Sequence, residues 1–290
     1  MKLSIVVIAY QMRREVPRTV QSLCAPYQRG VSGHDYEIIV VDNGSADPIR
    51  LTDLPTSDGR VRLIQHETSS PSPVDAVNLG VQEARGRFVA VIVDGARMAS
   101  PGVVARSLEQ LEQDPCAVAI VPAWHLGPDV QHRSIRSGYD QSVEDELLDA
   151  SEWTSDGYRL FGVSTLAPSS KPCVDGELPT EFSWFAIDRD RFVKLGGFDV
   201  RFQSSGGGLC NQEFRNRIVT QTSTTSVLIR SEGVFHQVHG GVTTNAPPED
   251  RPIARFHAEF EALTGRRFTP ATPNSLEVIG QLPNGARSSE

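Results

Sequence analysis

Apolar segments and amphipathic segments alternate along the first 122 residues of the chain. The apolar segments are typical of buried strands, because they are short, rich in β-branched residues and apolar at successive positions. They are Leu3–Tyr10, Tyr36–Val41, Val61–Gln65, Phe88–Val93 and Ala117–Val121. Between them, Val16–Leu23, Ser72–Ala84 and Gly102–Gln113 carry apolar residues at helical spacing. This alternation predicts parallel β-α-β units, and therefore an α/β fold with a mostly parallel central sheet flanked by helices.

The pattern changes after residue 122. Residues 127–156 are polar and acidic, as in a solvated helix face or a surface excursion, and residues 164–179 have the prolines and serines of a loop. The remaining predicted elements are strands at Glu181–Asp188 and Ser226–Ser231 and helices at Arg189–Leu195, about Asn211–Thr220 and Ile253–Leu263. From about Pro270 onward we expect poor order.

The composition limits the classes of partner. Acidic residues outnumber basic ones by 36 to 28, and the formal net charge is -8. Since there is no block of Lys or Arg, we expect no nucleic-acid binding and no attraction to anionic membranes. The apolar start LSIVVIAY is too short to span a bilayer and lacks a basic leader, which predicts a cytoplasmic protein without a transmembrane segment. The 4 cysteines are widely scattered, which is typical of reduced thiols rather than of a disulfide framework or a zinc site.

Candidate chemistry begins where the strand Phe88–Val93 ends, at Asp94 and Gly95. Ligands of open α/β sheets bind beyond the carboxyl ends of the strands, so this carboxylate is placed to hold a metal ion or a ribose. The alternative is an aspartate that only caps a turn. The neighbouring predicted strands end at Ala9-Tyr10 and at Asp42-Asn43, which would reach the same crevice. There, an Asp can accept a hydrogen bond from a base or a ribose and a Tyr can stack, although Asn-Gly is also a common turn.

Two well-known phosphate-binding motifs are missing. The first strand is not followed by GxGxxG, and GxxxxGK[ST] occurs nowhere in the chain. A nucleotide diphosphate would therefore need another source of positive charge, and Mg²⁺ or Mn²⁺ on Asp94 is the simplest one. His236 and His239, in FHQVHGG, could add an imidazole to such a metal, or they could be structural histidines.

The order of five motifs resembles that of family 2 glycosyltransferases with the GT-A fold. These motifs are SIVVIAY, EIIVVDNGS, DAVNLG, ARGRFVAVIVDGA and GGFD, and they extend over roughly residues 3–240. The resemblance implies one α/β domain over 1–240, with a nucleotide-sugar-binding half (1–122) and an acceptor half (123–240), followed by a helix and a poorly ordered tail (241–290). It also implies an inverting transfer of a sugar from a nucleotide diphosphate sugar, assisted by Mn²⁺ or Mg²⁺.

The same resemblance assigns roles to individual residues. Ala9, Tyr10 and Asp42 would hold the nucleoside, and Asp94 would be the first acid of the metal-binding DxD motif. His239 or His236 would be the histidine that some members add to the metal. Residues in the same motifs complete the expected nucleotide site, namely Asn43, Asn78 and Gly95.

The chain also departs from the family pattern. Ala96 replaces the second acid of DxD, and Val77 stands where the family commonly has an arginine. The acidic pair that usually opens the helix after GGFD falls on Cys210 and Asn211, so that the expected catalytic base is an amide. Glu213, two residues further on, is then the tentative base. Asp199 in the GGFD turn is the fallback, with turn formation as its alternative role.

One aromatic residue completes the expected site. Trp184 could offer its ring to an acceptor sugar, although core packing is the alternative. Three functions therefore compete. The first is sugar transfer from a UDP-, GDP- or dTDP-linked donor to a carbohydrate or small-molecule acceptor. The second is a catalytically weak or inactive nucleotide-binding module, which Ala96 and Asn211 would explain. The third is a nucleotidyltransferase, which needs a Gly-rich basic loop after the first strand that QMRREVPR supplies only in part.

Overall fold

An eight-stranded sheet forms the centre of the computed structural model, which describes residues 1–55, 60–241 and 252–283. Its strand order is β12-β10-β6-β9-β4-β1-β2-β3, and every pairing is parallel except those of β9 with β4 and β6. Its strands are β1 (Leu3–Ala9), β2 (Tyr36–Asp42), β3 (Val61–Gln65), β4 (Phe88–Ile92), β6 (Ala117–Ile120), β9 (Phe185–Asp188), β10 (Thr225–Ile229) and β12 (Leu276–Ile279). The predicted mostly parallel sheet is therefore confirmed.

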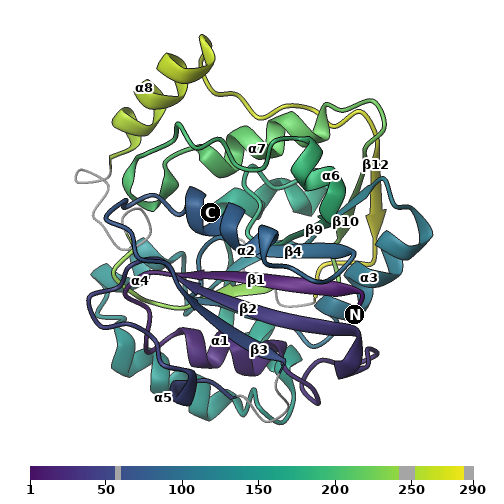
Figure 1. Cartoon of the computed structure of the whole chain (residues 1–290). Helices are drawn as coiled ribbons and strands as arrows, with labels where there is room; N and C mark the ends of the chain where they lie inside the picture. Colours follow the sequence, from purple (N-terminus) through teal and green to yellow (C-terminus); the bar gives the residue numbers. More distant parts are fainter. Residues whose placement is uncertain (56–59, 242–251, 284–290) are drawn as a thin grey trace.

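Helices cover both faces of this sheet because its inner strands are apolar on both faces (Figure 1). Leu3, Ile5 and Val7 of β1 point to one apolar core, while Val6 and Ile8 point to the other. The first core is closed by α1 (Val16–Leu23) and α3 (Val103–Gln113). The second is closed by α2 (Val74–Gln82), α6 (Arg189–Lys194), α7 (Cys210–Val219) and α8 (Ile253–Thr264).

A smaller four-stranded sheet lies at the carboxyl end of the central strands. Its order is β5-β11-β7-β8. The strands are β5 (Arg97–Ala99), β7 (Ala123–Leu126), β8 (Ser164–Leu166) and β11 (Val234–His236). Trp124, Leu126 and Phe235 pack with Leu148 and Trp153 into a third apolar cluster. This second sheet matters for function because it brings β11 next to the end of β4.

Three regions go beyond the sequence-based expectations or differ from them. The acidic segment 127–156 contains two helices, α4 (Gln131–Arg136) and α5 (Gln141–Ser151), the second capped by the Asp140 carboxylate. The supposed loop 164–179 contains β8 and a 3₁₀ helix, Pro168–Asp175. Both structures depend on pairing and packing with distant segments, for which short polar sequences give no periodic signal.

The C-terminal region provides the third correction. Residues 276–279 form the edge strand β12, parallel to β10, although poor order was expected from about Pro270. The backbone N–H of Arg230 donates to the carbonyl of Ile279 at 2.8 Å, which fixes this strand to the sheet. The helix predicted at Ile253–Leu263 is confirmed as α8. The other parts of the expected tail, 242–251 and 284–290, lie outside the described residues.

None of the helices within the described ranges combines the length and the apolar content needed to cross a bilayer. The four cysteines are unpaired thiols at distant positions, and Cys173 and Cys210 are buried.

Candidate active site

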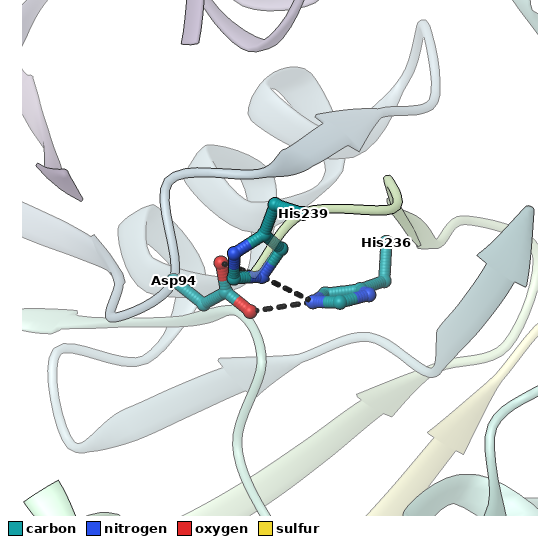
Figure 2. Close-up of side chains that lie close together, drawn as sticks. All are labelled: Asp94, His236 and His239. Carbon is teal, nitrogen blue, oxygen red and sulfur yellow. Dashed lines mark hydrogen bonds and ion pairs between the residues drawn. The ribbon is translucent and has the colours of Figure 1, made fainter. Parts of the chain in front are cut away.

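Two strand pairings bring three titratable side chains together beyond the end of β4. Asp94 follows β4 closely, and β5 begins at Arg97. β5 pairs antiparallel with β11, so that Arg97 lies opposite His236, and His239 follows on the loop after β11. Figure 2 shows the Asp94 carboxylate and the rings of His236 and His239 pointing toward one another.

The distances among these three side chains are suitable for holding one metal ion. Nε2 of His236 lies 2.7 Å from Oδ2 of Asp94. Nε2 of His239 lies 3.2 Å from Nε2 of His236 and 3.5 Å from Oδ1 of Asp94. One ligand atom from each residue lies within 4.8 Å of the other two. A carboxylate with two imidazoles suits Mn²⁺ or another transition ion better than it suits Mg²⁺.

The surroundings of His236 orient its Nε2 atom toward Asp94 and His239. Its Nδ1 atom contacts the side-chain amide of Gln131, which fixes the orientation of the ring. Burial lowers the pKa of His236 to about 4, which keeps the ring neutral at neutral pH. Nε2 faces Oδ2 of Asp94 at 2.7 Å, and a cation bound here would take the place of the proton that otherwise links the two atoms. The residues therefore fit a metal ion, with Gln131 orienting a ligand from behind.

Arg97 adds positive charge beside this cluster. Its side chain is almost fully buried, and Nη2 lies 3.6 Å from Oδ2 of Asp94. Its Nη1 atom is buried and has no hydrogen-bond partner among the described residues. Buried donors are nearly always paired, so an unpaired guanidinium nitrogen at a cavity wall indicates a place for an anionic ligand.

A cavity of about 640 Å³ opens beside these residues. Asp94, Arg97 and His239 line it, and so do Tyr10 and Asn43. Apolar residues from other elements complete part of the wall, namely Pro71, Pro73, Phe182, Ile253 and Phe256. Its volume lies within the range of small-molecule sites, roughly 300–1,000 Å³. The cavity can therefore accept a ligand of nucleotide size next to the three converging side chains.

The expected nucleoside residues divide into two groups. Tyr10 and Asn43 line the cavity, and Oδ1 of Asn43 is buried without a hydrogen-bond partner among the described residues. Asp42, in contrast, is fully buried, and its two oxygens accept hydrogen bonds from the backbone N–H groups of Ser45 (2.9 Å) and Ile49 (2.8 Å). Asp42 thus caps its own loop, and its expected role in nucleoside binding stays a prediction.

The loop that follows β1 is held in place by hydrogen bonds with the loop that follows β2. The carbonyl of Ala9 accepts from the N–H of Asn43 at 2.8 Å, and Ala9 is fully buried within β1. Gln11 has φ 55°, and its N–H donates to Oγ of Ser45 at 2.8 Å. Ala9 thus contributes backbone that ties the ends of β1 and β2 together, and the exposed ring of Tyr10 is the group that faces the cavity.

Two further expected nucleotide residues have structural roles. Gly95 lies against the end of β1, where a Cβ atom would come within 2.6 Å of the carbonyl oxygen of Ile8. Asn78 binds both backbone groups of Phe198, each at 2.9 Å, and so fixes the GGFD turn. Neither residue belongs to the cavity wall among the described residues, and their direct contact with a nucleotide stays a prediction.

The two residues expected near the catalytic base are both engaged elsewhere. Asn211, at the first turn of α7, accepts from the N–H of Phe182 at 3.2 Å and donates to its carbonyl at 2.7 Å. Glu213 forms an ion pair with Arg217 at 2.7 Å, and Arg217 also donates to the carbonyl of Gly197 at 2.8 Å. Among the described residues, the cavity wall includes Asn211 but not Glu213. Glu213 connects α7 to the preceding turn, so the structure corrects its assignment as the base.

Trp184 also differs from the expectation. Its side chain is fully buried in the core under α3, and Nε1 donates to Oγ of Ser107 at 3.1 Å. An indole enclosed in this way cannot stack on an acceptor sugar, so the alternative of core packing is correct. The next residue, Phe185, is fully buried as well.

Three residues of the site were not identified from the sequence. Arg97 and Gln131 are described above, and Glu181 lines the cavity. Burial raises the pKa of Glu181, and the negative charge of Asp94 acts in the same direction while Arg97 opposes both. Arg97 could have been suspected because it follows Asp94 so closely in the chain. Gln131 and Glu181 reach the site through tertiary structure, and no spacing in the sequence marks them.

Comparison with known families shows to which family the chain belongs. Residues 4–166, more than half of the chain, match the model of "Glycosyl transferase family 2". The chain belongs to glycosyl transferase family 2. This membership confirms the resemblance inferred from the five motifs and the enzyme class that it implies. The matched region includes β1, β2, β4 and Asp94, although it ends before His236 and His239.

Individual relatives are more distant. The chain is 33% identical over 115 residues to the succinoglycan biosynthesis protein ExoO of Rhizobium meliloti (strain 1021), which covers 40% of this chain and 31% of that protein. Among solved structures it is similar to TarS of S. aureus, with a TM-score of 0.51, 16% identity, and coverage of 82% of this chain and 37% of that one. It is also similar to GalNAc-T7, solved with UDP, GalNAc and Mn²⁺, with a TM-score of 0.53, 18% identity, and coverage of 81% and 44%.

These structural similarities confirm the GT-A type of α/β fold. The chain spans about a third of the length of ExoO and less than half of the two structural neighbours.

Proposed function

We propose that this member of glycosyl transferase family 2 transfers a sugar from a nucleotide diphosphate sugar to an acceptor hydroxyl. The observation that carries the proposal is the convergence of Asp94, His236 and His239 on one point at the wall of a nucleotide-sized cavity. Family membership supplies the reaction class, and these side chains supply a place for the cation that the missing phosphate-binding motifs call for.

Different residues of the chain would bind different parts of the donor. Tyr10 would stack on the nucleoside or donate to it, and the unpaired Oδ1 of Asn43 would accept a hydrogen bond from the base or the ribose. Asp94, His236 and His239 would hold Mn²⁺ or Mg²⁺, with Mn²⁺ the better match to two imidazoles. Arg97 would donate to phosphate oxygens through its unpaired Nη1 atom.

This arrangement would help the departure of the nucleotide diphosphate. A bound divalent cation would supply positive charge to the phosphate oxygens. Arg97 would add a fixed donor whose orientation is set before the reaction, so little reorganisation accompanies charge development. The acceptor would enter along the wall that contains Phe182 and Phe256. Direct attack of its hydroxyl opposite the leaving diphosphate would invert the anomeric carbon.

GalNAc-T7, a structural neighbour, was solved with UDP and Mn²⁺. That neighbour shows the fold alone, so the nucleotide and the metal of this chain must be measured. Titration calorimetry with UDP, GDP and dTDP, each with and without Mn²⁺, should reveal one nucleotide whose binding strengthens with the metal. The Asp94→Asn variant should lose this metal dependence, while Asp149→Asn, an exposed position on α5, should retain it.

Activity separates the competing functions. Transfer to an added acceptor, or hydrolysis, should be measured with UDP-glucose, UDP-N-acetylglucosamine, GDP-mannose and dTDP-rhamnose. Release of nucleoside diphosphate supports sugar transfer. Metal-dependent nucleotide binding without release would indicate a binding module, and release of pyrophosphate from a nucleoside triphosphate would indicate a nucleotidyltransferase.

A further inference from the structure

The proposed transfer requires a base that this chain does not present at the family's usual position. The residue there is Asn211, and an amide cannot remove a proton from a hydroxyl at neutral pH. Glu213 is engaged by Arg217 and does not belong to the cavity wall described above. Another carboxylate must face the acceptor if the chain is active.

The topology places Glu181 on the wall of the cavity that Asp94 also lines. β9 is antiparallel to β4, and its first residue, Phe185, pairs with Val91 near the carboxyl end of β4. The chain that leads into β9 therefore runs past the end of β4, where Asp94 lies. Glu181 lies on this incoming segment and lines the same cavity as Asp94. Its charge also acts on Cys210 in the first turn of α7, next to the family's base position.

The Glu181 carboxylate is not used by the scaffold. No hydrogen bond or ion pair engages it among the described residues, and Arg97 and Asp94 act on it only through their charges. The other cavity carboxylate, Asp94, is committed to the two imidazoles. A carboxylate at a cavity wall that forms no bond within the protein is available to a ligand.

Asn211 holds the segment that carries Glu181. Its side-chain amide binds both the N–H and the carbonyl of Phe182, the residue that follows Glu181. Because the amide both donates and accepts, a carboxylate at position 211 could not form this pair of hydrogen bonds. The amide of Asn211 thus fixes the backbone segment that carries the Glu181 carboxylate.

We propose that Glu181 is the general base of the transfer and that Asn211 is a positioning residue for it. The inference rests on the proposed function. The acceptor oxygen forms the new bond to the anomeric carbon, while its proton moves to a carboxylate oxygen of Glu181. The bond between the anomeric carbon and the diphosphate oxygen breaks, and its electron pair leaves with the nucleoside diphosphate.

The test compares Glu181→Gln with Glu213→Gln in the full chain, with Glu177→Gln as an exposed control. Each variant is assayed for transfer with the nucleotide sugar that the wild type uses, and for binding of the matching nucleoside diphosphate with Mn²⁺. Loss of the base should lower kcat by about 10²–10⁴-fold in Glu181→Gln and leave nucleotide binding unchanged. Glu181→Asp should restore part of the rate, and formate should partly rescue Glu181→Ala but not Glu213→Ala.

The outcomes separate the two proposals. If the wild type binds nucleotide but releases nothing from any donor, the proposed function fails and the role of Glu181 fails with it. If the wild type is active and Glu181→Gln keeps more than about a tenth of kcat, only the role of Glu181 is overturned. A large loss in Glu213→Gln with intact nucleotide binding would instead return the base to Glu213. Unchanged nucleotide binding in Glu181→Gln also shows that the variant is folded.

Discussion

Asp42 ends β2 and Asp94 lies just beyond β4, the two strands on either side of β1, yet the two carboxylates have different contacts. Asp42 ends β2 and is enclosed by backbone N–H groups of its own loop, which satisfy both of its oxygens. Asp94 follows β4 and faces two imidazoles and the cavity, with a quarter of its side chain exposed. Position at a strand end therefore does not decide the role of a carboxylate. The groups that face it decide whether it serves the loop or a ligand.

The largest difference between the two aspartates should appear in activity. Asp94→Asn removes a charge from the proposed metal site, and metal-assisted charge stabilisation is worth several kcal/mol, so we expect a loss of transfer of about a thousandfold. Asp42→Asn should retain most activity per folded molecule, because Asp42 does not line the cavity. Transfer kinetics normalised to the folded fraction provide the measurement. Equal losses in both variants would remove the distinction.

Gln131 tests whether the imidazole of His236 is oriented for a metal. Gln131→Leu removes the partner of Nδ1 while keeping the buried volume similar. Loss of such an orienting partner typically lowers metal affinity by about 10–100-fold, which calorimetry with Mn²⁺ can measure. As a control, Asn78→Leu removes an equally specific polar clamp at the GGFD turn, outside the metal cluster. Its Mn²⁺ affinity should be unchanged, and a loss matching that of Gln131→Leu would indicate a general structural effect.

The free energy of unfolding should show the opposite order, with the larger loss in Asp42→Asn. Asp42→Asn places an NH₂ group against one of two buried backbone donors, which should lower the free energy of unfolding by about 1–3 kcal/mol. Asp94→Asn should change stability less, since its carboxylate holds no comparable set of backbone donors. Denaturant unfolding of both variants gives these values. A greater destabilisation by Asp94→Asn would show that Asp94 also serves the scaffold.

The buried carboxylate of Glu144 extends the comparison to the pH dependence of stability. It accepts from the N–H of Val238, next to His239, at 2.7 Å, and burial raises its pKa to about 7 from 4.5. The folded chain then binds a proton more tightly than the unfolded chain, so the stabilisation is complete below pH 4.5 and is lost as pH rises through about 7. Glu144→Gln should reduce this decline by about 1–2 kcal/mol between pH 5 and 8.

Denaturant unfolding at several pH values would measure the effect of Glu144. If the free energy of unfolding falls with pH as steeply in Glu144→Gln as in the wild type, the pH dependence belongs to other groups. Asp149→Gln, on the exposed side of the same helix α5, is the matched control and should leave the slope as it is in the wild type.

The sequence was sufficient to predict the elements with strong periodic patterns. The helix Val16–Leu23 and the strand Val61–Gln65 have the predicted limits, and the buried strand before Asp94 is β4. The edge strand β12 was missed because its stability depends on backbone pairing with β10 rather than on an apolar pattern of its own. For the acidic segment the sequence allowed a solvated helix face or a surface excursion, and the structure contains the helices α4 and α5 there.

The site could be predicted only in part. Asp94, His236 and His239 converge as the motifs implied, and Tyr10 and Asn43 reach the cavity. Asp42 and Asn78 match the same motifs, but hydrogen bonds formed only in the folded chain engage them. Glu181 could not be found from the sequence, because an antiparallel strand inserted beside β4 brings it to the site.

The most direct test of the metal cluster is an anomalous diffraction experiment on crystals grown with Mn²⁺ and the nucleoside diphosphate that binds best. The account predicts one manganese peak within about 2.0–2.4 Å of a carboxylate oxygen of Asp94 and of Nε2 of His236 or His239, with a phosphate oxygen completing the contacts. A bound nucleotide without manganese at Asp94, or manganese bound elsewhere in the cavity, would contradict it.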